Sequence, residues 1–273
     1  MMGTGSTTGV MLLAEFKTTD ITYAGHTVQL PDDPIYAKFY TKLRAGRWEP
    51  ETFRVLRRNL NKQTIYVDIG AWIGVTPLWA SFVAKSVIAV EPDPKCHAFL
   101  SQLARQYANV KVIHRALSNR DHVSIRAVGE FGNSASTVLD ISDGESVRVK
   151  GYGMTDILKE VGRQPLFMKI DIEGYEFDMA SEIEQLKSYE VCGLQIAVHP
   201  QIFERNLRGN WLNKRWKTYL ETRKLARVLK QQLPNLRIEG HFSLLSYTVF
   251  GVLLRPKPIG TDFVFEKAIP VLP

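Results

Sequence analysis

The segment from Thr64 to Pro77 constrains the fold of this chain more than any other. Residues up to Val67 predict a buried strand, Asp68-x-Gly70 predicts a sharp turn, and Thr76-Pro77 predicts a helix start with Thr76 as its N-cap. Glycine serves where the backbone takes unusual angles or a ligand must come close. A strand, a glycine turn and a helix N-terminus in this order are typical of a nucleotide-binding corner.

The residues of the turn indicate which nucleotide it suits. A dinucleotide-binding turn has the pattern G-x-G-x-x-G, whose middle glycine lets a pyrophosphate touch the backbone, whereas this chain has Trp72 at that position. Asp68 at the strand end would also repel a phosphate. S-adenosylmethionine carries a sulfonium and an ammonium group and no phosphate, so the turn favours this cofactor.

A second strand supports the same interpretation. Residues 86–90 are mostly apolar. The next residue is Glu91, which lies 21 residues after Gly70. An acid at this place can accept hydrogen bonds from both ribose hydroxyls. Asp93-Pro94 then predicts the N-cap and first residue of a helix that runs to Tyr107. We further expect contacts to the cofactor from Ala71, Gly74 and Ala116.

Strands and helices alternate along the chain, which predicts an α/β fold with a mostly parallel sheet. The predicted strands of this sheet are 65–68, 86–90, 110–114, 165–170 and 194–198. The predicted helices are 34–45, 51–60, 77–84, 94–107, 155–161 and a long one within 205–230. Hairpins are predicted at 20–30, at 123–127 with 146–149 around a polar loop at 132–136, and at 236–242 with 248–254. This gives a disordered leader (1–19), an N-terminal extension (20–62), a catalytic domain (63–257) and a C-terminal tail (258–273).

A second group of chemically active residues lies in Lys169-Ile-Asp-Ile-Glu-Gly-Tyr-Glu176. Asp171 and Glu173 follow one predicted strand, and His199 ends the next. Because ligands of open α/β sheets lie at the carboxyl ends of the strands, these three residues form a candidate catalytic set. His199 is the better base near neutral pH, a buried carboxylate with a raised pKa is an alternative, and a divalent metal held by all three is another.

These motifs resemble the FkbM family of S-adenosylmethionine-dependent methyltransferases over roughly residues 20–255. The resemblance rests on Asp68-Ile-Gly-Ala-Trp-Ile-Gly74, Glu91-Pro92, Lys169 to Glu176, Gly46-Arg-Trp-Glu-Pro50 and Asn133-Ser-Ala-Ser136. It implies a Rossmann-like class I methyltransferase fold and methylation of an alcohol oxygen on a sugar, glycolipid or polyketide. By position, Asp68 and Gly70 would border the methionine part, Glu91 would hold the ribose, and Asp171 with Glu173 would lie beside the methyl. Trp72 departs from the family, which usually has asparagine there.

Charge is concentrated in one segment. The net charge is +7, and residues 204–230 alone carry a net charge of +7, so the rest is neutral. The basic residues are Arg205, Arg208, Lys214, Arg215, Lys217, Arg223, Lys224, Arg227 and Lys230. Leu212, Trp216, Tyr219 and Leu220 form one apolar face, and the stripe then shifts toward Leu225, which indicates a break or a helix covered on two sides. A solvated outer face, an anionic lipid surface and nucleic acid all remain open as explanations.

Two other functions also remain open. The basic segment could serve an RNA-directed methyltransferase, although Trp211 and Trp216 have amphipathic spacing rather than the arrangement of a stacking platform. Trp72 could instead block the cofactor and leave a binding module without catalysis. Cys96 and Cys192 are too few for a disulfide framework, and the first ten residues lack the basic region of a secretory signal. Together these features predict that the protein is located in the reducing cytoplasm.

Overall fold

The structure is a computed structural model that describes residues 16–127, 131–132, 136–137, 146–173, 175–238 and 244–267. Most of the expected disordered leader therefore lies outside the described residues. None of the helices in the described ranges combines the length and apolar character needed to cross a membrane.

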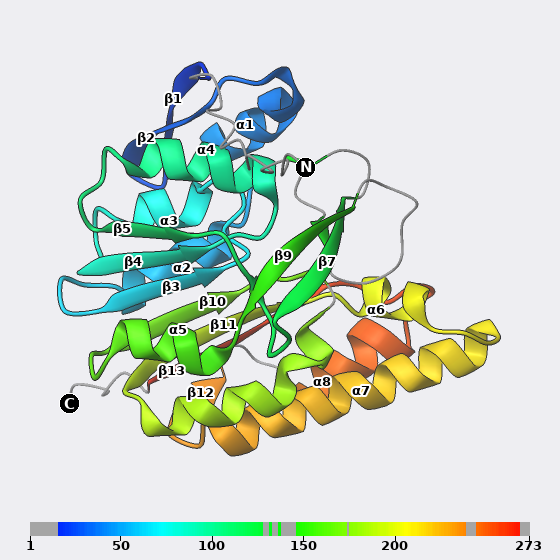
Figure 1. Ribbon diagram of the computed structural model, residues 1–273. Helices are drawn as coiled ribbons and strands as arrows, with labels where there is room; N and C mark the ends of the chain where they lie inside the picture. Colours follow the sequence, from blue (N-terminus) through cyan, green and yellow to red (C-terminus); the bar gives the residue numbers. More distant parts are fainter. Residues whose placement is uncertain are drawn as a thin grey trace, which may run out of the picture.

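A seven-stranded sheet forms the centre of the molecule, with the strand order β12-β13-β11-β10-β3-β4-β5 (Figure 1). Its strands are β3 (Ile65–Ile69), β4 (Ser86–Val90), β5 (Val110–Ile113), β10 (Leu166–Ile170), β11 (Val191–Val198), β12 (Leu236–Ile238) and β13 (Thr261–Lys267). Neighbours from β5 to β11 are parallel, whereas β13 is antiparallel to both β11 and β12. The predicted mostly parallel α/β sheet is thus confirmed, and the strand order reverses between β3 and β10, where such folds bind ligands.

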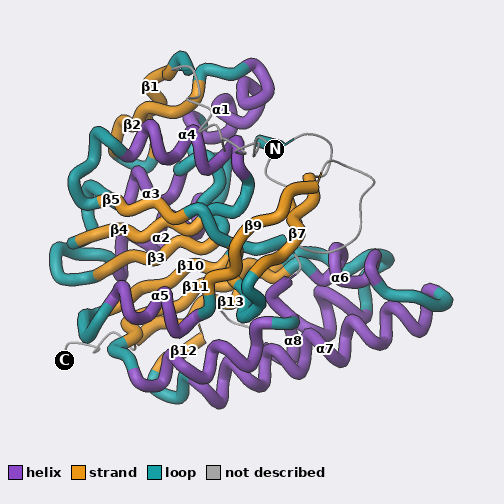
Figure 2. The backbone as a smooth tube through the Cα atoms, in the orientation of Figure 1, coloured by secondary structure: helices purple, strands orange, loops and turns teal. Residues whose placement is uncertain are grey.

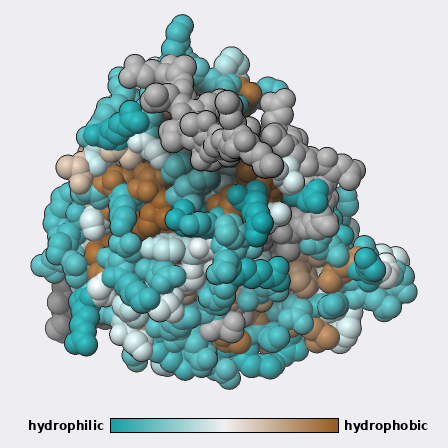
Figure 3. Space-filling model, in the orientation of Figure 1, coloured by the Kyte–Doolittle hydropathy of each residue, from teal (hydrophilic) through white to brown (hydrophobic). Residues whose placement is uncertain are grey.

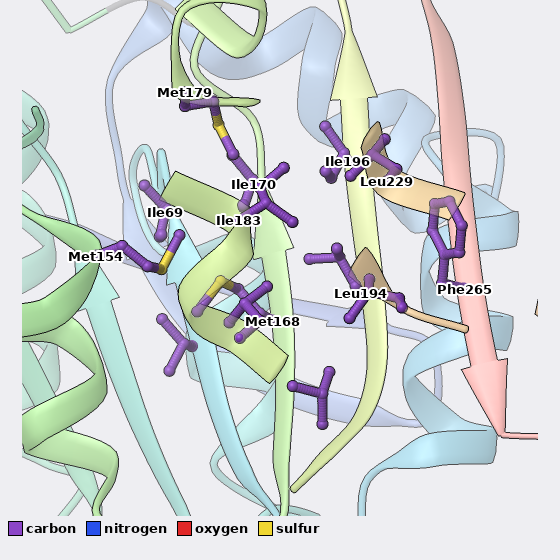
Figure 4. Packing of buried hydrophobic residues seen from close by; sticks show 14 of the residues in the cluster. Ile69, Met154, Met168, Ile170, Met179, Ile183, Leu194, Ile196, Leu229 and Phe265 are labelled. Carbon is purple, nitrogen blue, oxygen red and sulfur yellow. The ribbon is translucent and has the colours of Figure 1, made fainter. Parts of the chain in front are cut away.

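Helices cover both faces of this sheet (Figures 1 and 2). One face packs against α1 (Ala37–Arg44), α2 (Pro50–Asn59), α3 (Val75–Ala80) and α4 (Pro94–Ala104), and the other against α5 (Met154–Val161), the 3-10 helix η3 (Met179–Ser188) and α7 (Trp211–Gln232). Every residue of β3 is buried, with Tyr66 in the first layer and Val67 in the second. Figure 4 shows the second layer, where Met168 and Ile170 of β10 lie among residues of α5, η3 and α7. Burial on both faces explains why the strands are continuous apolar runs.

Two smaller sheets flank the central one. The N-terminal hairpin pairs β1 (Thr18–Tyr23) with β2 (His26–Pro31), and the 3-10 helix η1 (Pro34–Tyr36) leads from it into α1. The inserted hairpin pairs β7 (His122–Ala127) with β9 (Ser146–Tyr152), with β6 (Ala116–Leu117) and β8 (Ser136–Thr137) at its sides. The hairpins predicted at 20–30 and at 123–127 with 146–149 are confirmed, while residues 133–135 of the polar loop lie outside the described ranges.

The C-terminal elements correct the predicted terminal hairpin. Residues 248–254 are helical, because α8 (Leu244–Thr248) continues into the π-helical turn η4 (Val249–Leu253). Thr248, Gly251 and Val252 are buried at helical spacing, a pattern that a short apolar run leaves ambiguous. The antiparallel partner of β12 is β13, which comes from the predicted tail and buries Phe263 and Phe265.

Two predicted helix features also need correction. Gly74, with φ of +97°, is the N-cap of α3, and Thr76 lies inside the helix, where its hydroxyl donates to Asp68. The predicted start of α4 is confirmed, since Asp93 accepts hydrogen bonds from the backbone of Lys95 and Cys96, but the helix ends at Ala104 and not at Tyr107. Helix α7 runs unbroken and buries one face that includes Tyr219 and Leu225.

The exposed side of α7 explains the apparent shift of the stripe. Leu212, Trp216 and Leu220 face outward, so the first part of the predicted apolar face does not belong to the core. The buried face is formed instead by Thr218, Tyr219 and Thr222 before it continues through Leu225.

Candidate functional site

Gly70 brings the ends of β3 and β10 into contact. Its φ is +84°, and a Cβ built on it would lie 1.8 Å from the carbonyl oxygen of Asp171. The Asp171 amide in turn donates to the carbonyl of Ile69 at 2.9 Å. The glycine is therefore required by a neighbouring strand of the same chain, and this contact places Asp171 beside the turn.

We expect Gly70→Ala to destabilise the fold and to displace Asp171, because an atom cannot stay that close to a backbone oxygen. Gly46→Ala is a matched control: Gly46 also has a positive φ, +64°, but open space around the position of a Cβ. The control loses only the backbone preference, about 1–2 kcal/mol for a residue with a Cβ at a left-handed φ, so thermal unfolding of both variants separates strain from collision. Equal losses in the two variants would contradict this account.

Asp68 is fully buried. Its carboxylate accepts hydrogen bonds from Thr76 and from the Tyr66 hydroxyl, and the ammonium of Lys169 lies 4.0 Å away. Burial raises the pKa of Asp68, which Lys169 and Thr76 oppose. Asp68 therefore has hydrogen-bond and ion-pair partners within the chain, and these contacts link β3, α3 and β10.

Glu91 ties the turn to the end of β4. One of its oxygens accepts from the backbone N–H of Trp72 at 2.6 Å, and the other accepts from the N–H of Asp93 at 2.8 Å. Burial raises the pKa of Glu91 to about 8. The carboxyl group also lines a cavity beside the turn, so it can offer its remaining lone pairs to a ligand.

Two cavities meet at the reversal of strand order. The narrow one, about 60 Å³, is lined by Glu91, Arg115, Ala116 and apolar residues of β6 and β7. The wide one, about 490 Å³, extends toward α1 and holds Ala71, Lys169 and His199. The lining of both includes Gly70, Trp72, Asp171 and Glu173.

Of the cofactor residues expected from the sequence, four reach these cavities and two do not. Gly70, Glu91 and Ala116 line the narrow cavity, and Ala71 lines the wide one. Asp68 and Gly74 are absent from both linings. Gly74 instead faces Leu100 and Leu78, since a Cβ there would lie 2.6 Å from the Leu100 side chain.

Trp72 forms part of an aromatic wall of the wide cavity. Its ring contacts those of Phe39 and Tyr36 edge-on, with centroids 4.8 Å and 5.6 Å away, and Trp48 packs on Phe39. The indole N–H and the Tyr36 hydroxyl both donate to the carbonyl of Gly132. The indole therefore fixes the start of the inserted loop against the cavity.

Asp171, Glu173 and His199 converge as the sequence predicts. The Nε2 atom of His199 lies 3.7 Å from an Asp171 oxygen and 3.9 Å from a Glu173 oxygen. Its Nδ1 atom is 2.8 Å from the fully buried Glu176. Lys169 forms an ion pair with Asp171 at 2.9 Å. Glu176 thus holds the imidazole so that Nε2 faces the two carboxylates.

The charges of this cluster change which group can act as a base. Burial alone would lower the pKa of His199, but Glu176, Glu173 and Asp171 raise it to about 10. Burial raises the pKa of Glu173 to about 7. Burial would also raise the pKa of Asp171, yet Lys169 and His199 hold it below its ordinary value. The raised pKa of His199 disfavours it as a base near neutral pH, whereas a pKa of about 7 suits Glu173 to accept a proton.

The same three residues could hold a divalent cation. Each offers one ligand atom, and these atoms all lie within 4.8 Å of one another. Carboxylate oxygens and an imidazole nitrogen are ligands for several divalent metals. Binding would require His199 to lose its Nε2 proton.

Backbone strain is concentrated around the wide cavity. Among the described residues other than glycine, φ is positive at Ala24, Glu49, Trp72 and Glu173. The last three all line the wide cavity, whereas Ala24 belongs to the N-terminal hairpin turn. Strained residues persist where the surrounding structure enforces them and gather at functional sites. The strain supports this cavity as the functional site.

Several residues of the site were not predicted from the sequence. Lys169 and Glu176 lie in the motif that contains Asp171, but the sequence does not show that they pair with Asp171 and His199. Glu49 lies near Lys169, and burial raises its pKa to about 7. The aromatic wall from α1 has no signal in the sequence, because its residues are also spaced as ordinary core residues.

Comparison with known proteins identifies the family. The model described as the methyltransferase FkbM domain matches residues 68–227, more than half of the chain. The chain belongs to this family. It is therefore an S-adenosylmethionine-dependent methyltransferase, as the resemblance of its motifs predicted.

Three of the solved structures that match have low sequence identity to this chain. A putative methyltransferase from Streptococcus mutans, in complex with SAH, has 13% identity and a TM-score of 0.47 over 80% of this chain and 97% of that one. An rRNA methylase from Streptococcus thermophilus has 12% identity and a TM-score of 0.44 over 80% and 95%. The Methanococcus jannaschii fibrillarin pre-rRNA processing protein has 9% identity and a TM-score of 0.43 over 94% and 86%. No curated protein matches the chain.

Proposed function

We propose that this methyltransferase acts on an alcohol oxygen of a sugar or a similar polyhydroxylated acceptor, free or attached to a lipid. The wide cavity carries this proposal, because it combines an aromatic wall with carboxylates. Aromatic rings pack against the C–H faces of sugar rings, and carboxylates accept hydrogen bonds from their hydroxyls. Lys38 and Lys42 also line the cavity, on the exposed side of α1.

The residues that line the narrow cavity suit the nucleoside part of the cofactor. Glu91 would accept hydrogen bonds from the ribose, and Leu117, Ile125 and Val90 provide apolar surface for the base. Gly70 and Asp171 lie where the two cavities join, so a methyl group carried there would face the wide cavity. When bound, S-adenosylmethionine supplies a methyl carbon that bonds to the acceptor oxygen as its bond to sulfur breaks.

Glu173 serves as the proton acceptor in this proposal. An alcohol is a weak nucleophile until its proton begins to leave, so a base must lie within hydrogen-bond reach. Glu173 takes the hydroxyl proton while the oxygen gains the methyl group. Asp171, held by Lys169, accepts a hydrogen bond that orients the acceptor. His199 remains charged and keeps the two carboxylates together.

This assignment predicts the pH dependence of the reaction. Glu173 can accept a proton only when ionised, so kcat/KM should rise with pH and level off above the Glu173 pKa of about 7. If His199 were the base, the rise would continue toward its pKa of about 10. Initial rates across this range, at saturating cofactor, distinguish the two residues.

Glu91→Gln tests the cofactor assignment. The amide keeps the size of the side chain but accepts at one atom only, and we expect S-adenosylmethionine to bind roughly tenfold more weakly in calorimetry. Glu160→Gln, on the exposed end of α5, is a control for the same exchange of a carboxyl for an amide away from the cavities. Unchanged affinity in Glu91→Gln would remove Glu91 from the ribose site.

The acceptor class can be tested directly. The protein is incubated with methyl-labelled S-adenosylmethionine and with separate glycolipid, polysaccharide and RNA extracts. We expect label in sugar-containing fractions, as methyl ethers that survive mild base and are located by mass spectrometry. Label in RNA, or on nitrogen, would contradict the proposal, and absence of cofactor binding would favour a module without catalysis.

A further inference from the structure

Exposed apolar side chains gather on one part of the molecule. Ten large apolar residues are exposed in the described part of the chain, and eight of them lie between residues 211 and 259. Trp211 and Trp216 are 71% and 53% exposed. We call the following residues the α7 patch: Trp211, Leu212, Trp216 and Leu220 of α7, with Leu245, Phe250 and Leu254 of the adjoining C-terminal segment.

The two halves of the α7 patch are joined by Arg215. This buried guanidinium donates to the carbonyls of Val252, Arg255 and Pro256 at 2.6–2.8 Å, so the segment after η4 is fixed against α7. Leu212, Trp216 and Leu220 recur at every fourth position and thus form one stripe along the helix. Figure 1 shows α8 beside α7, and Figure 3 shows apolar surface in the region of α7 and α8. The patch is therefore a fixed surface.

Basic side chains surround the α7 patch. Lys217, Lys224, Arg227 and Lys230 are exposed on α7, and Arg255 with Lys257 are exposed beside Leu254. The acidic residues of the same segment are already engaged, since Glu204 pairs with Arg215 and Glu221 lies 3.6 Å from Lys224. The surface around the patch is consequently positive.

A groove of about 250 Å³ adjoins the patch at the C-terminal half of α7. Three cations line it, Arg223, Arg227 and Lys230, together with Leu244 and Leu245. No acidic residue is among the described residues that line it. A groove with several cations beside aliphatic side chains suits a phosphate group that is attached to a hydrocarbon chain.

We propose that the α7 patch docks on an anionic lipid bilayer. Tryptophan is favoured at the boundary between headgroups and acyl chains, leucine and phenylalanine gain from burial below it, and lysine and arginine are attracted to anionic headgroups. The aliphatic members of the patch argue against RNA, because bases stack on aromatic rings. The surrounding positive charge argues against a second copy of the chain, because like charges would meet.

The proposal is tested by vesicle flotation with the full chain. We expect wild-type protein to float with vesicles rich in phosphatidylserine, to remain behind with vesicles of phosphatidylcholine alone, and to dissociate as salt is raised. The double variants Trp211→Ser with Trp216→Ser, and Lys224→Glu with Arg227→Glu, should each bind at least about tenfold more weakly. Phe82→Ser is the control, since Phe82 is exposed on α3's side of the sheet, away from the patch.

Circular dichroism and thermal unfolding confirm that each variant is folded. Failure of the wild-type protein to bind phosphatidylserine vesicles would overturn the proposal, as would undiminished binding by both double variants. Dimerisation without lipid that the tryptophan variant abolishes, or RNA retention without vesicle binding, would equally overturn it. These measurements require no methyl transfer, so their outcome does not depend on whether the proposed acceptor is correct.

Discussion

Glu173→Gln is expected to lower kcat roughly 10²–10⁴-fold, the range typical for loss of a general base. The amide is close in size to the carboxyl group but cannot take the acceptor proton. S-adenosylmethionine should bind with nearly unchanged affinity, because Glu91 and the narrow cavity remain. Single-turnover rates and calorimetry measure the two quantities separately.

The control for Glu173→Gln is Glu184→Gln. Glu184 is exposed on η3, where it forms a surface ion pair with Lys187 at 3.6 Å. This variant should keep wild-type turnover. If Glu173→Gln retained turnover within about twofold while His199→Gln lost it, the imidazole would be the proton acceptor and the assignment of Glu173 would be wrong.

Arg215→Met is expected to destabilise the protein by about 3 kcal/mol, near the lower end for breaking a buried charge pair. Arg215 is 8% exposed, contacts Glu204 at 2.8 Å and donates to three backbone carbonyls. Methionine fills much of the volume but leaves all of these acceptors without their donor. The free energy of unfolding in urea gives the loss.

Arg227→Met on the same helix provides the comparison. Arg227 is exposed, and its replacement should change stability by less than about 0.5 kcal/mol. A loss below about 1 kcal/mol in Arg215→Met would show that the C-terminal segment is held by its apolar contacts and not by this guanidinium.

Much of the fold could be predicted because its signals are local. The run from Ile65 to Ile69, the turn at Gly70 and the Asp93-Pro94 cap each act over a few residues, so they can be recognised without knowledge of the rest of the chain. The errors arose where two local patterns compete. Thr76 is a residue type that caps helices, but its hydroxyl donates to Asp68 instead. Residues 248–254 have the composition of a strand, but they form helical turns and bury a helical face.

The sequence alone determined the family motifs, the parallel sheet and the convergence of Asp171, Glu173 and His199 on one edge. These follow because the carboxyl ends of parallel strands meet at the same side of a sheet. Only the tertiary structure decided which groups surround the imidazole. Glu176 is 23 residues from His199 in the sequence, and its contact with Nδ1 raises the pKa of the imidazole. Gly70 and the carbonyl of Asp171 likewise meet only through the pairing of β3 with β10, since contact between distant segments depends on packing that no short stretch of sequence records.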